Sequence, residues 1–263
     1  KPQEISNTVW AYATIGYKID LFELDTFVSK TTSMLKEFKL QEIINLLWSL
    51  AVFNFEDFDA VDLLFSRIIE DCIPQTNNED DCCNLSAEAL SQLHQVSLWY
   101  NKECKKDSLL PPKLRSESKL AFIASESCPS KLQKDVSKTF ESLKSLGLFV
   151  VDEEIHCNQT GYSLDILIGM KNSQRVMAIE IDGPSHFIDL SPNGATTLKR
   201  RQLSSLADRP LLSIPYWEWD KLSYNNNRKN QLSIEGTEID DNNDEKRRKQ
   251  RYLQECLQEA SFL

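Results

Sequence analysis

An internal repeat in the first third of the chain is the feature that most constrains the fold. The segments Glu4–Tyr17 and Glu42–Phe55 align at a spacing of 38 residues, with matching Glu, Ile, Asn, Trp and Ala. Each segment has helical apolar spacing, and a second amphipathic helix is expected after each one, at Thr26–Phe38 and at Ala60–Cys72. Helix pairs that recur at this period predict an α-solenoid, in which every unit buries its apolar side against its neighbours.

A third unit is expected to start at Ser86, after a polar insertion at Gln75–Asn84. Its segment Ser91–Gln95 falls where Asn45–Ser49 lies in the second unit, although the match is looser. The helical segment is therefore predicted to cover residues 1–105.

Two residue types recur at fixed positions of the repeat. Trp10 and Trp48 are interpreted as packing residues between stacked helices. Asn7 and Asn45 also share one helical position, and two interpretations stay open for them. They could each read one RNA base, as side chains of helical-repeat RNA readers do, or they could hydrogen-bond between repeats.

The middle of the chain indicates a boundary between two domains. Pro111 and Pro112 lie in a polar stretch that starts at Lys106 and runs to Pro129. We therefore predict a linker at 106–129 and a second domain at 130–263, with a polar insertion at 223–245 that has the composition of a solvated loop.

The second domain is predicted to be an α/β domain whose elements follow the order helix, three strands, helix, strand. Apolar spacing, alternation and the positions of Gly and Pro place these elements at 130–146, 148–156, 162–168, 176–181, 196–206 and 211–214. A final helix is expected at 246–257, and its basic start is either a solvated face or an addition to a phosphate-binding surface.

The charge of the chain limits how it can contact nucleic acid. The net charge is −10, and residues 1–112 alone carry nine Lys and Arg against 18 Asp and Glu. Only residues 183–231 are basic, with seven Lys and Arg against four Asp and Glu. A phosphate-binding surface must therefore be local, because the field of the whole molecule repels RNA.

Composition excludes several classes of protein and site. No apolar run approaches the ~20 residues that span a bilayer, so no membrane segment is expected. The seven cysteines contain no C-x-x-C pair and are odd in number, which argues against a zinc site or a disulfide framework.

The stretch 178–222 gathers most of the residues with chemical potential. Its sequence blocks IEIDGPSHF, TLKRRQL and SIPYWEWDKL resemble the RAP domain, a module found at the C-termini of organellar RNA-binding proteins such as the FAST kinase-like and octotricopeptide-repeat families. The N-terminal repeats are similar to the heptatricopeptide-like repeats that precede RAP domains in FAST kinase-like proteins. The resemblance implies an RNA-binding protein of the mitochondrion, or alternatively of the plastid.

The RAP domain is similar in fold to the PD-(D/E)XK nucleases, which raises the question of catalysis. Such a nuclease needs an Asp on one strand and a D/E-x-K on the next, and Asp165 and Glu180 occupy the two acidic positions. These two carboxylates would hold Mg²⁺, while no other cofactor is expected. The residue two after Glu180 is Asp182 instead of Lys, so Lys199 on the following helix would have to replace the missing ammonium group.

The binding interpretation uses the same stretch differently. Lys199, Arg200 and Arg201 offer charge-assisted contacts to phosphates, and Ser185 and His186 add donors. His186 alternatively serves as a general base or as a structural residue. An aromatic shelf that can stack on bases is expected at Tyr216, Trp217 and Trp219, although core packing is the alternative for the two tryptophans.

Three functions therefore compete. The first is an organellar RNA-binding protein that acts in RNA processing, stability or translation, with mRNA or rRNA as its partner. The second is a metal-dependent endoribonuclease that uses Asp165, Glu180 and Asp182. The third is a structural subunit of a large assembly such as an organellar ribosome, in which the acidic repeats contact ribosomal or RNA-processing proteins and the basic patch contacts RNA.

Overall fold

The structure is a computed structural model that describes residues 1–72, 85–124, 129–171, 173–207, 209–223 and 241–263. Its contacts divide the chain into two compact units. The helical unit contains Lys1–Glu126, Asn158–Tyr162 and His186–Ala207. The α/β unit contains Ser127–Cys157, Ser163–Ser185 and Asp208–Leu263. The expected insertion at Gln75–Asn84 and most of the one at 223–245 lie outside the described residues.

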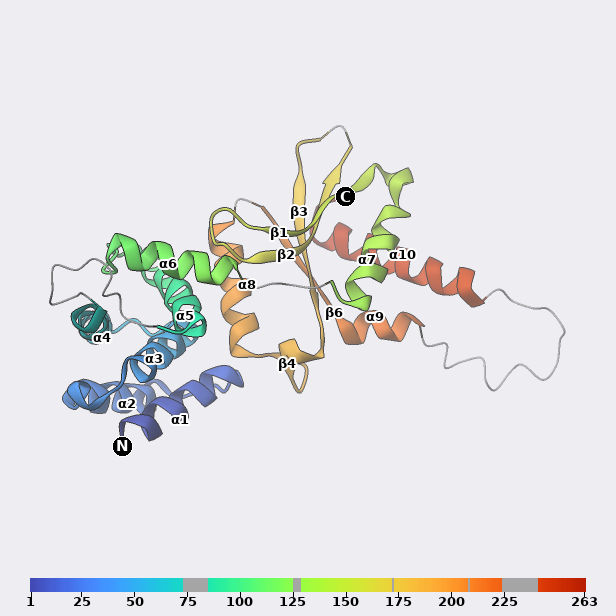
Figure 1. The fold of residues 1–263 in the computed structure, drawn as a ribbon. Helices are drawn as coiled ribbons and strands as arrows, with labels where there is room; N and C mark the ends of the chain where they lie inside the picture. The colour runs from blue at the N-terminus through green and yellow to red at the C-terminus, as the bar shows by residue number, and fades with distance from the viewer. Residues whose placement is uncertain (73–84, 125–128, 172, 208, 224–240) are drawn as a thin grey trace. The chain divides into compact units, whose positions relative to one another are not determined.

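The helical unit has the helices that the repeat predicts. They are α1 (Pro2–Thr14), α2 (Leu21–Ser33), α3 (Leu40–Phe53), α4 (Phe58–Cys72) and α5 (Ala87–Ser97), which continues as a π-helical turn at Leu98–Glu103. Helix α2 begins before the predicted Thr26, because the side chain of Asp20 caps it by accepting a hydrogen bond of 2.8 Å from the Phe22 amide. The helical N-terminal region is thus consistent with repeats (Figure 1).

The first helix of each repeat ends in the same backbone conformation. Gly16 and Asn54 occupy corresponding repeat positions, and both are left-handed, with φ of 69° and 54°. Glycine and asparagine are the residues that most readily adopt this conformation after a helix, where it closes the last turn. This match supports the alignment of the two segments.

The two repeated tryptophans lie in different environments. Trp48 is 6% exposed, and its indole N–H donates a hydrogen bond of 2.8 Å to Oε1 of Gln95 on α5. Trp10 is 39% exposed, because α1 packs on α3 through Val9 and Ala13. The packing interpretation is therefore right for Trp48 and wrong for Trp10.

Part of the predicted linker is a packed helix. Helix α6 (Pro112–Ile123) starts with a proline at its first position and packs on α5. Leu114 is buried and belongs to the core of the helical unit, and Ser118 is also buried. The stretch 106–129 is therefore a linker only in part, because apolar residues of α6 pack in this core.

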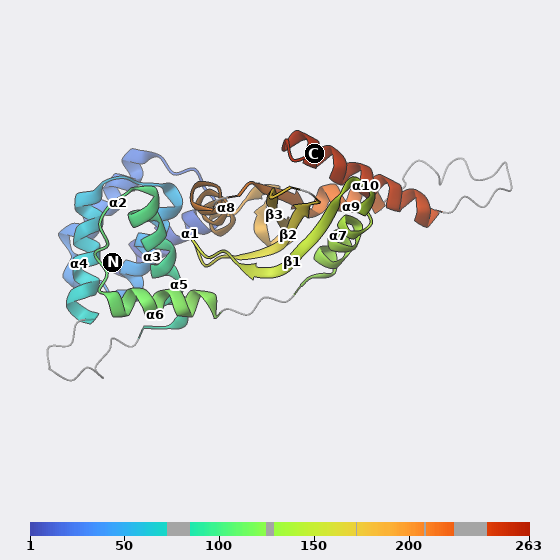
Figure 2. The same cartoon turned by 90° about the horizontal axis from the view of Figure 1, so that it is seen from above.

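The α/β unit contains a four-stranded sheet in the order β1-β2-β3-β6. The strands are β1 (Leu148–His156), β2 (Ser163–Met170), β3 (Val176–Asp182) and β6 (Leu211–Pro215), with the first three antiparallel and β6 parallel to β3. Three helices, α7 (Lys131–Glu141), α9 (Tyr216–Ser223) and α10 (Asp241–Glu259), lie beside this sheet (Figure 2). Their apolar side chains form one core with those of the sheet. The predicted order of helix, three strands, helix, strand is present, whereas the comparison with nucleases stays an expectation.

The helix between β3 and β6 is α8 (Gly194–Leu206), and it belongs to the helical unit. Leu198 is fully buried in the core of that unit. At Gly194 an added Cβ would lie 1.9 Å from the carbonyl oxygen of Ala13, so only glycine allows α8 to approach the end of α1 this closely. The structure thus differs from a division of the chain at residue 130, because the apolar face of α8 is buried by the helices that precede it in sequence.

A short hairpin precedes α8. Its strands are β4 (Phe187–Ile188) and β5 (Ser191–Pro192). Among the residues that the structure describes, no helix combines the length and apolar character that a membrane crossing requires.

Candidate nucleic-acid interface

Helix α8 carries the three predicted phosphate contacts, and its N-terminus is fixed by its own cap. The side-chain oxygen of Asn193 accepts a hydrogen bond of 2.9 Å from the Thr196 amide. The Asn193 amide donates to the carbonyl oxygen of His186 at 2.9 Å, which ties α8 to the residue that precedes the hairpin. The helix therefore starts at a defined point.

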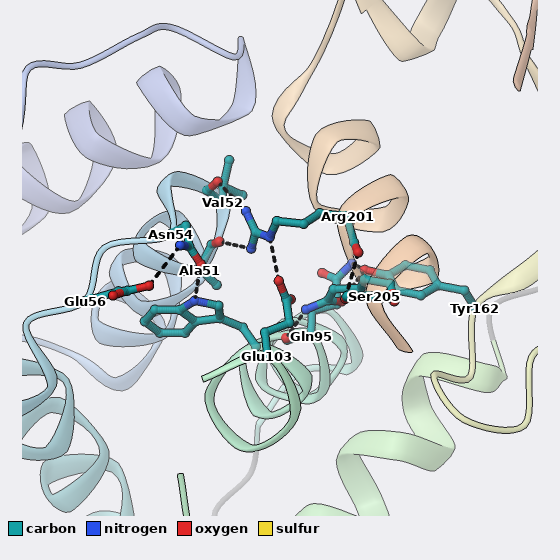
Figure 3. Close-up of polar contacts among 11 residues, drawn as sticks. Ala51, Val52, Asn54, Glu56, Gln95, Glu103, Tyr162, Arg201 and Ser205 are labelled. Atoms are coloured by element: carbon teal, nitrogen blue, oxygen red, sulfur yellow. Dashed lines mark hydrogen bonds and ion pairs between the residues drawn. The ribbon is translucent and has the colours of Figure 1, made fainter. Parts of the chain in front are cut away.

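Arg201 is engaged by protein acceptors. Its Nε donates to Oε2 of Glu103 at 2.6 Å, and its Nη1 donates to the carbonyl oxygen of Val52 at 3.0 Å. Its Nη2 also donates to the carbonyl oxygen of Ala51 (Figure 3). Ala51 and Val52 lie in the last turn of α3, where the helix dipole favours a cation. The carbonyl oxygen of Ala51 also accepts a hydrogen bond of 3.3 Å from the Asn54 amide. Arg201 thus caps α3 and pairs with Glu103.

A closed ring of hydrogen bonds joins Gln202, the neighbour of Arg201 on α8, to Gln95 and Tyr162. Nε2 of Gln95 donates to the Tyr162 hydroxyl at 2.9 Å, and this hydroxyl donates to Oε1 of Gln202 at 2.9 Å. Nε2 of Gln202 returns a hydrogen bond of 2.9 Å to the backbone oxygen of Gln95 (Figure 3 shows Gln95 and Tyr162). Burial raises the pKa of Tyr162, so its hydroxyl stays protonated and can donate. Every amide of the set is satisfied, which stabilises the position of α8.

The other predicted contacts around α8 differ in their exposure. Lys199, Arg200 and His186 have intermediate exposure, whereas Ser185 is exposed. The guanidinium of Arg200 lies 5.6 Å from the ring centroid of Phe187. A role of these four residues in RNA contact stays a prediction.

The three residues of the expected aromatic shelf lie on a helix. Tyr216, Trp217 and Trp219 lie on α9, directly after β6. Trp219 is 2% exposed and donates from its indole N–H to Oδ2 of Asp135 at 2.9 Å, so core packing accounts for it. Tyr216 and Trp217 are partly exposed and meet edge to face at 5.3 Å between ring centroids. Of the three, these two are the candidates for stacking on a base.

The two polar positions of the repeat also differ. Asn7 is exposed. Asn45 accepts a hydrogen bond of 2.9 Å from Nε2 of Gln41, one turn earlier on α3, and Gln41 Nε2 also donates to Gln92 at 3.1 Å. Asn45 therefore takes part in a polar contact that reaches α5, and base reading by either asparagine stays a prediction.

The predicted acidic site lies on one face of the sheet. Ile166 pairs with Ile179 and both lie in the core, so alternation places Asp165, Glu180 and Asp182 on the opposite face. Oδ2 of Asp165 accepts a hydrogen bond of 2.6 Å from the Ile181 amide. Glu180 and Asp182 are 3% and 2% exposed, and Asp182 accepts a hydrogen bond from the Ser213 hydroxyl.

The shared face of the acids does not amount to a recognisable metal centre. Among the described residues, no group of three or more His, Cys, Asp or Glu side chains is arranged to hold a metal ion. Binding of Mg²⁺ by Asp165 and Glu180 therefore stays a prediction, as does any replacement of the missing ammonium group by Lys199.

A polar cluster between α7 and α10 was not anticipated. Nζ of Lys249 donates to Oδ2 of Asp135 at 2.7 Å and also to Oε1 of Glu245, and its ammonium lies 5.5 Å from the Trp219 ring centroid. Partial burial opposes the ionised form of Asp135, but the hydrogen bonds from Lys249 and Trp219 lower its pKa. The hydrogen bonds from Lys249 and Ser223 likewise lower the pKa of Glu245. No sequence motif predicts this cluster, because Asp135 and Lys249 are 114 residues apart.

A pocket of about 360 Å³ lies at this cluster. Its lining comes from one face of α7 and one face of α10, and it comprises Asp135, Lys138, Thr139, Ser142, Glu245, Lys246 and Lys249. The spacing of the α7 members, at every third or fourth position, is the one signal of a shared face that the sequence contains.

Comparison with known families identifies a RAP domain at residues 179–233. RAP domains are generally RNA-binding modules. The matched residues run from the second half of β3 through α8, β6 and α9, and therefore include parts of both units. Comparison with curated proteins gives no significant match.

Proposed function

We propose that this protein binds RNA and that its RAP module takes part in the contact. The RAP domain at residues 179–233 is the observation that carries this proposal. The three sequence blocks that resemble the module occur in the expected order, on β3, α8 and the β6–α9 segment.

The resemblance further supports a role in organellar RNA processing, stability or translation, in the mitochondrion or alternatively in the plastid. The helical unit would then position the RAP module or bind a protein partner. Its acidic charge supports this division of labour, because nine Lys and Arg against 18 Asp and Glu at residues 1–112 disfavour extended phosphate contact there.

The test is direct measurement of RNA affinity with the full chain over a range of salt concentrations. For three or four phosphate contacts on single-stranded RNA, the logarithm of the association constant is expected to fall with the logarithm of salt at a slope of about −2 to −3. An affinity that is absent at low salt, or that does not depend on salt, would contradict the proposal.

An endoribonuclease is the second candidate, and the common face of Asp165 and Glu180 is the observation that favours it. Here the expected result is RNA cleavage that needs Mg²⁺ or Mn²⁺ and is lost in Asp165→Ala while RNA binding is retained. RNA binding without RNA cleavage in the presence of either metal would contradict the endoribonuclease and support RNA binding as the function.

A further inference from the structure

The groove between α7 and α10, defined by the lining of the 360 Å³ pocket, has lysines on both sides. Lys138 comes from α7 and Lys246 from α10, and both side chains are exposed. Lys131 lies seven residues before Lys138, on the same face of α7, and is exposed as well. Both helices belong to the α/β unit, so this groove is formed within one compact part of the chain.

The carboxylates in this groove are already compensated. Asp135 and Glu245 both accept hydrogen bonds from Lys249, and Asp135 also accepts one from Trp219. Lys138, Lys246 and Lys249 thus share the groove with two carboxylates, and both carboxylates are hydrogen-bonded to the buried Lys249. Of the exposed lysines, Lys138 also lowers the pKa of Asp135 through its charge, whereas Lys131 and Lys246 are open to solvent.

These three lysines differ in their partners from Arg201 on α8. Arg201 donates to Glu103 and to two carbonyl groups of α3, and it would have to leave them to hold a phosphate. In the described part of the chain, the side chains of Lys131, Lys138 and Lys246 form no hydrogen bond or ion pair that would have to be broken. Phosphate contact through an exposed lysine costs little besides side-chain entropy.

We infer that the α7–α10 groove is a binding site for the phosphate backbone of single-stranded RNA, with Lys131, Lys138 and Lys246 as its contacts. The inference rests on the proposed function and assigns its main phosphate contacts to a surface outside residues 179–233. The volume of the groove, about 360 Å³, lies at the lower end of the range of about 300–1,000 Å³ that is usual for small-ligand pockets.

The test compares two variants of the full chain with equal charge. The first replaces Lys131, Lys138 and Lys246 by Gln, and the control replaces Lys18, Lys30 and Lys36, which are exposed on the helical unit. The probe is a labelled oligouridine of about 16 nucleotides, long enough for single-strand sites. Association constants are measured over a range of salt concentrations, and thermal unfolding verifies that each variant is folded.

The groove variant is expected to bind at least about 10-fold more weakly at low salt, with a salt slope reduced in magnitude by about 2 for three lost contacts. The control variant is expected to change affinity by less than about 2-fold, because its charges act only through the general field. Equal losses in both variants, or no loss in the groove variant, would overturn the inference and leave the proposed function standing.

Three further outcomes separate failure of the inference from failure of the proposed function. If the unaltered protein does not bind the probe, the proposed function fails and the groove fails with it. If binding is lost in Lys199→Gln but retained in the groove variant, RNA is held at α8 and the groove is not the site. Protection of the groove lysines from acetylation by inorganic phosphate but not by RNA would also overturn it.

Discussion

Helices α8 and α10 both contain a run of basic residues, and the structure uses the two runs differently. On α8, Arg201 is directed into the protein and caps α3. On α10, Lys249 is directed into the protein and compensates two carboxylates, whereas Lys246 is exposed on a groove. A basic run therefore mixes cations that bind acceptors within the protein with cations that are exposed to solvent. The face of the helix on which a residue lies decides between the two.

The chemistry of Arg201 and Lys249 explains their partners. A guanidinium is planar and presents several N–H donors, so Arg201 can serve a carboxylate and two carbonyl groups together. An ammonium group is compact, and Lys249 bridges two carboxylates from α7 and α10. Four predictions follow, from the largest expected effect to the smallest. Those on Arg201 and Lys249 test this contrast directly, and those on Tyr162 and His94 test buried hydrogen bonds that involve neither cation.

Arg201→Ala is expected to lower the free energy of unfolding by about 3 kcal/mol, because it leaves the Glu103 carboxylate buried without its cation. The last carbonyl groups of α3 lose their cap as well. Urea unfolding gives the measurement, and Arg247→Ala on the exposed side of α10 is the matched control. Equal stability of the two variants would show that Arg201 has no structural role.

Tyr162→Phe is expected to cost about 2 kcal/mol, since the Gln95 and Gln202 amides each lose a buried hydrogen-bond partner. Thermal unfolding measures the effect. Tyr216→Phe serves as the control, because Tyr216 is only partly buried. A loss no greater than in that control would mean that the hydrogen bonds around α8 do not stabilise it.

Lys249→Met is expected to cost about 1 kcal/mol, which is less than Arg201→Ala, because water can reach Asp135 and Glu245 once the cation is gone. Their carboxyl groups should also take up protons at higher pH than in the unaltered protein, since Lys249 helps to keep both pKa values low. NMR titration of these two carboxyl groups checks the second effect. Unchanged titration would mean that Lys249 does not compensate them.

His94 is expected to give the smallest effect. Burial lowers its pKa, and the neutral ring donates from Nε2 to the carbonyl oxygen of Thr160 at 2.8 Å. Above about pH 6.5 both folded and unfolded states keep this ring neutral, so stability is fully present. Below that pH the unfolded state gains a proton that the folded state resists, and stability falls.

Thermal unfolding of His94→Gln between pH 7.5 and pH 5.5 checks this, because glutamine keeps a donor for Thr160 and does not titrate. The variant is expected to lose less stability over this range than the unaltered protein. An identical loss would assign the pH dependence to other groups.

Much of the fold follows from patterns that lie close together in sequence. Alternation and apolar spacing predicted β1 at Leu148–His156 with the observed bounds, and they predicted the paired helices of the first two repeats. Helix α6 lies in the stretch that was predicted as a linker, because its few apolar residues become significant only when α5 and α6 pack together and Leu114 is buried. The candidate site was less predictable, since exposure of a cation depends on contacts with residues far away in the chain.

The sequence by itself determined the elements, the RAP-like blocks and the local restriction of positive charge, because helix and strand periodicity and charge are properties of neighbouring residues. Only the tertiary structure decided that α8 belongs to the helical unit, that Arg201 caps α3 and that lysines of α7 and α10 share a groove. Glu103 and Arg201 are 98 residues apart, and packing of apolar faces brings them together. No pattern of neighbouring residues predicts this pairing, because the packing of the whole core determines which residue lies next to a buried charge.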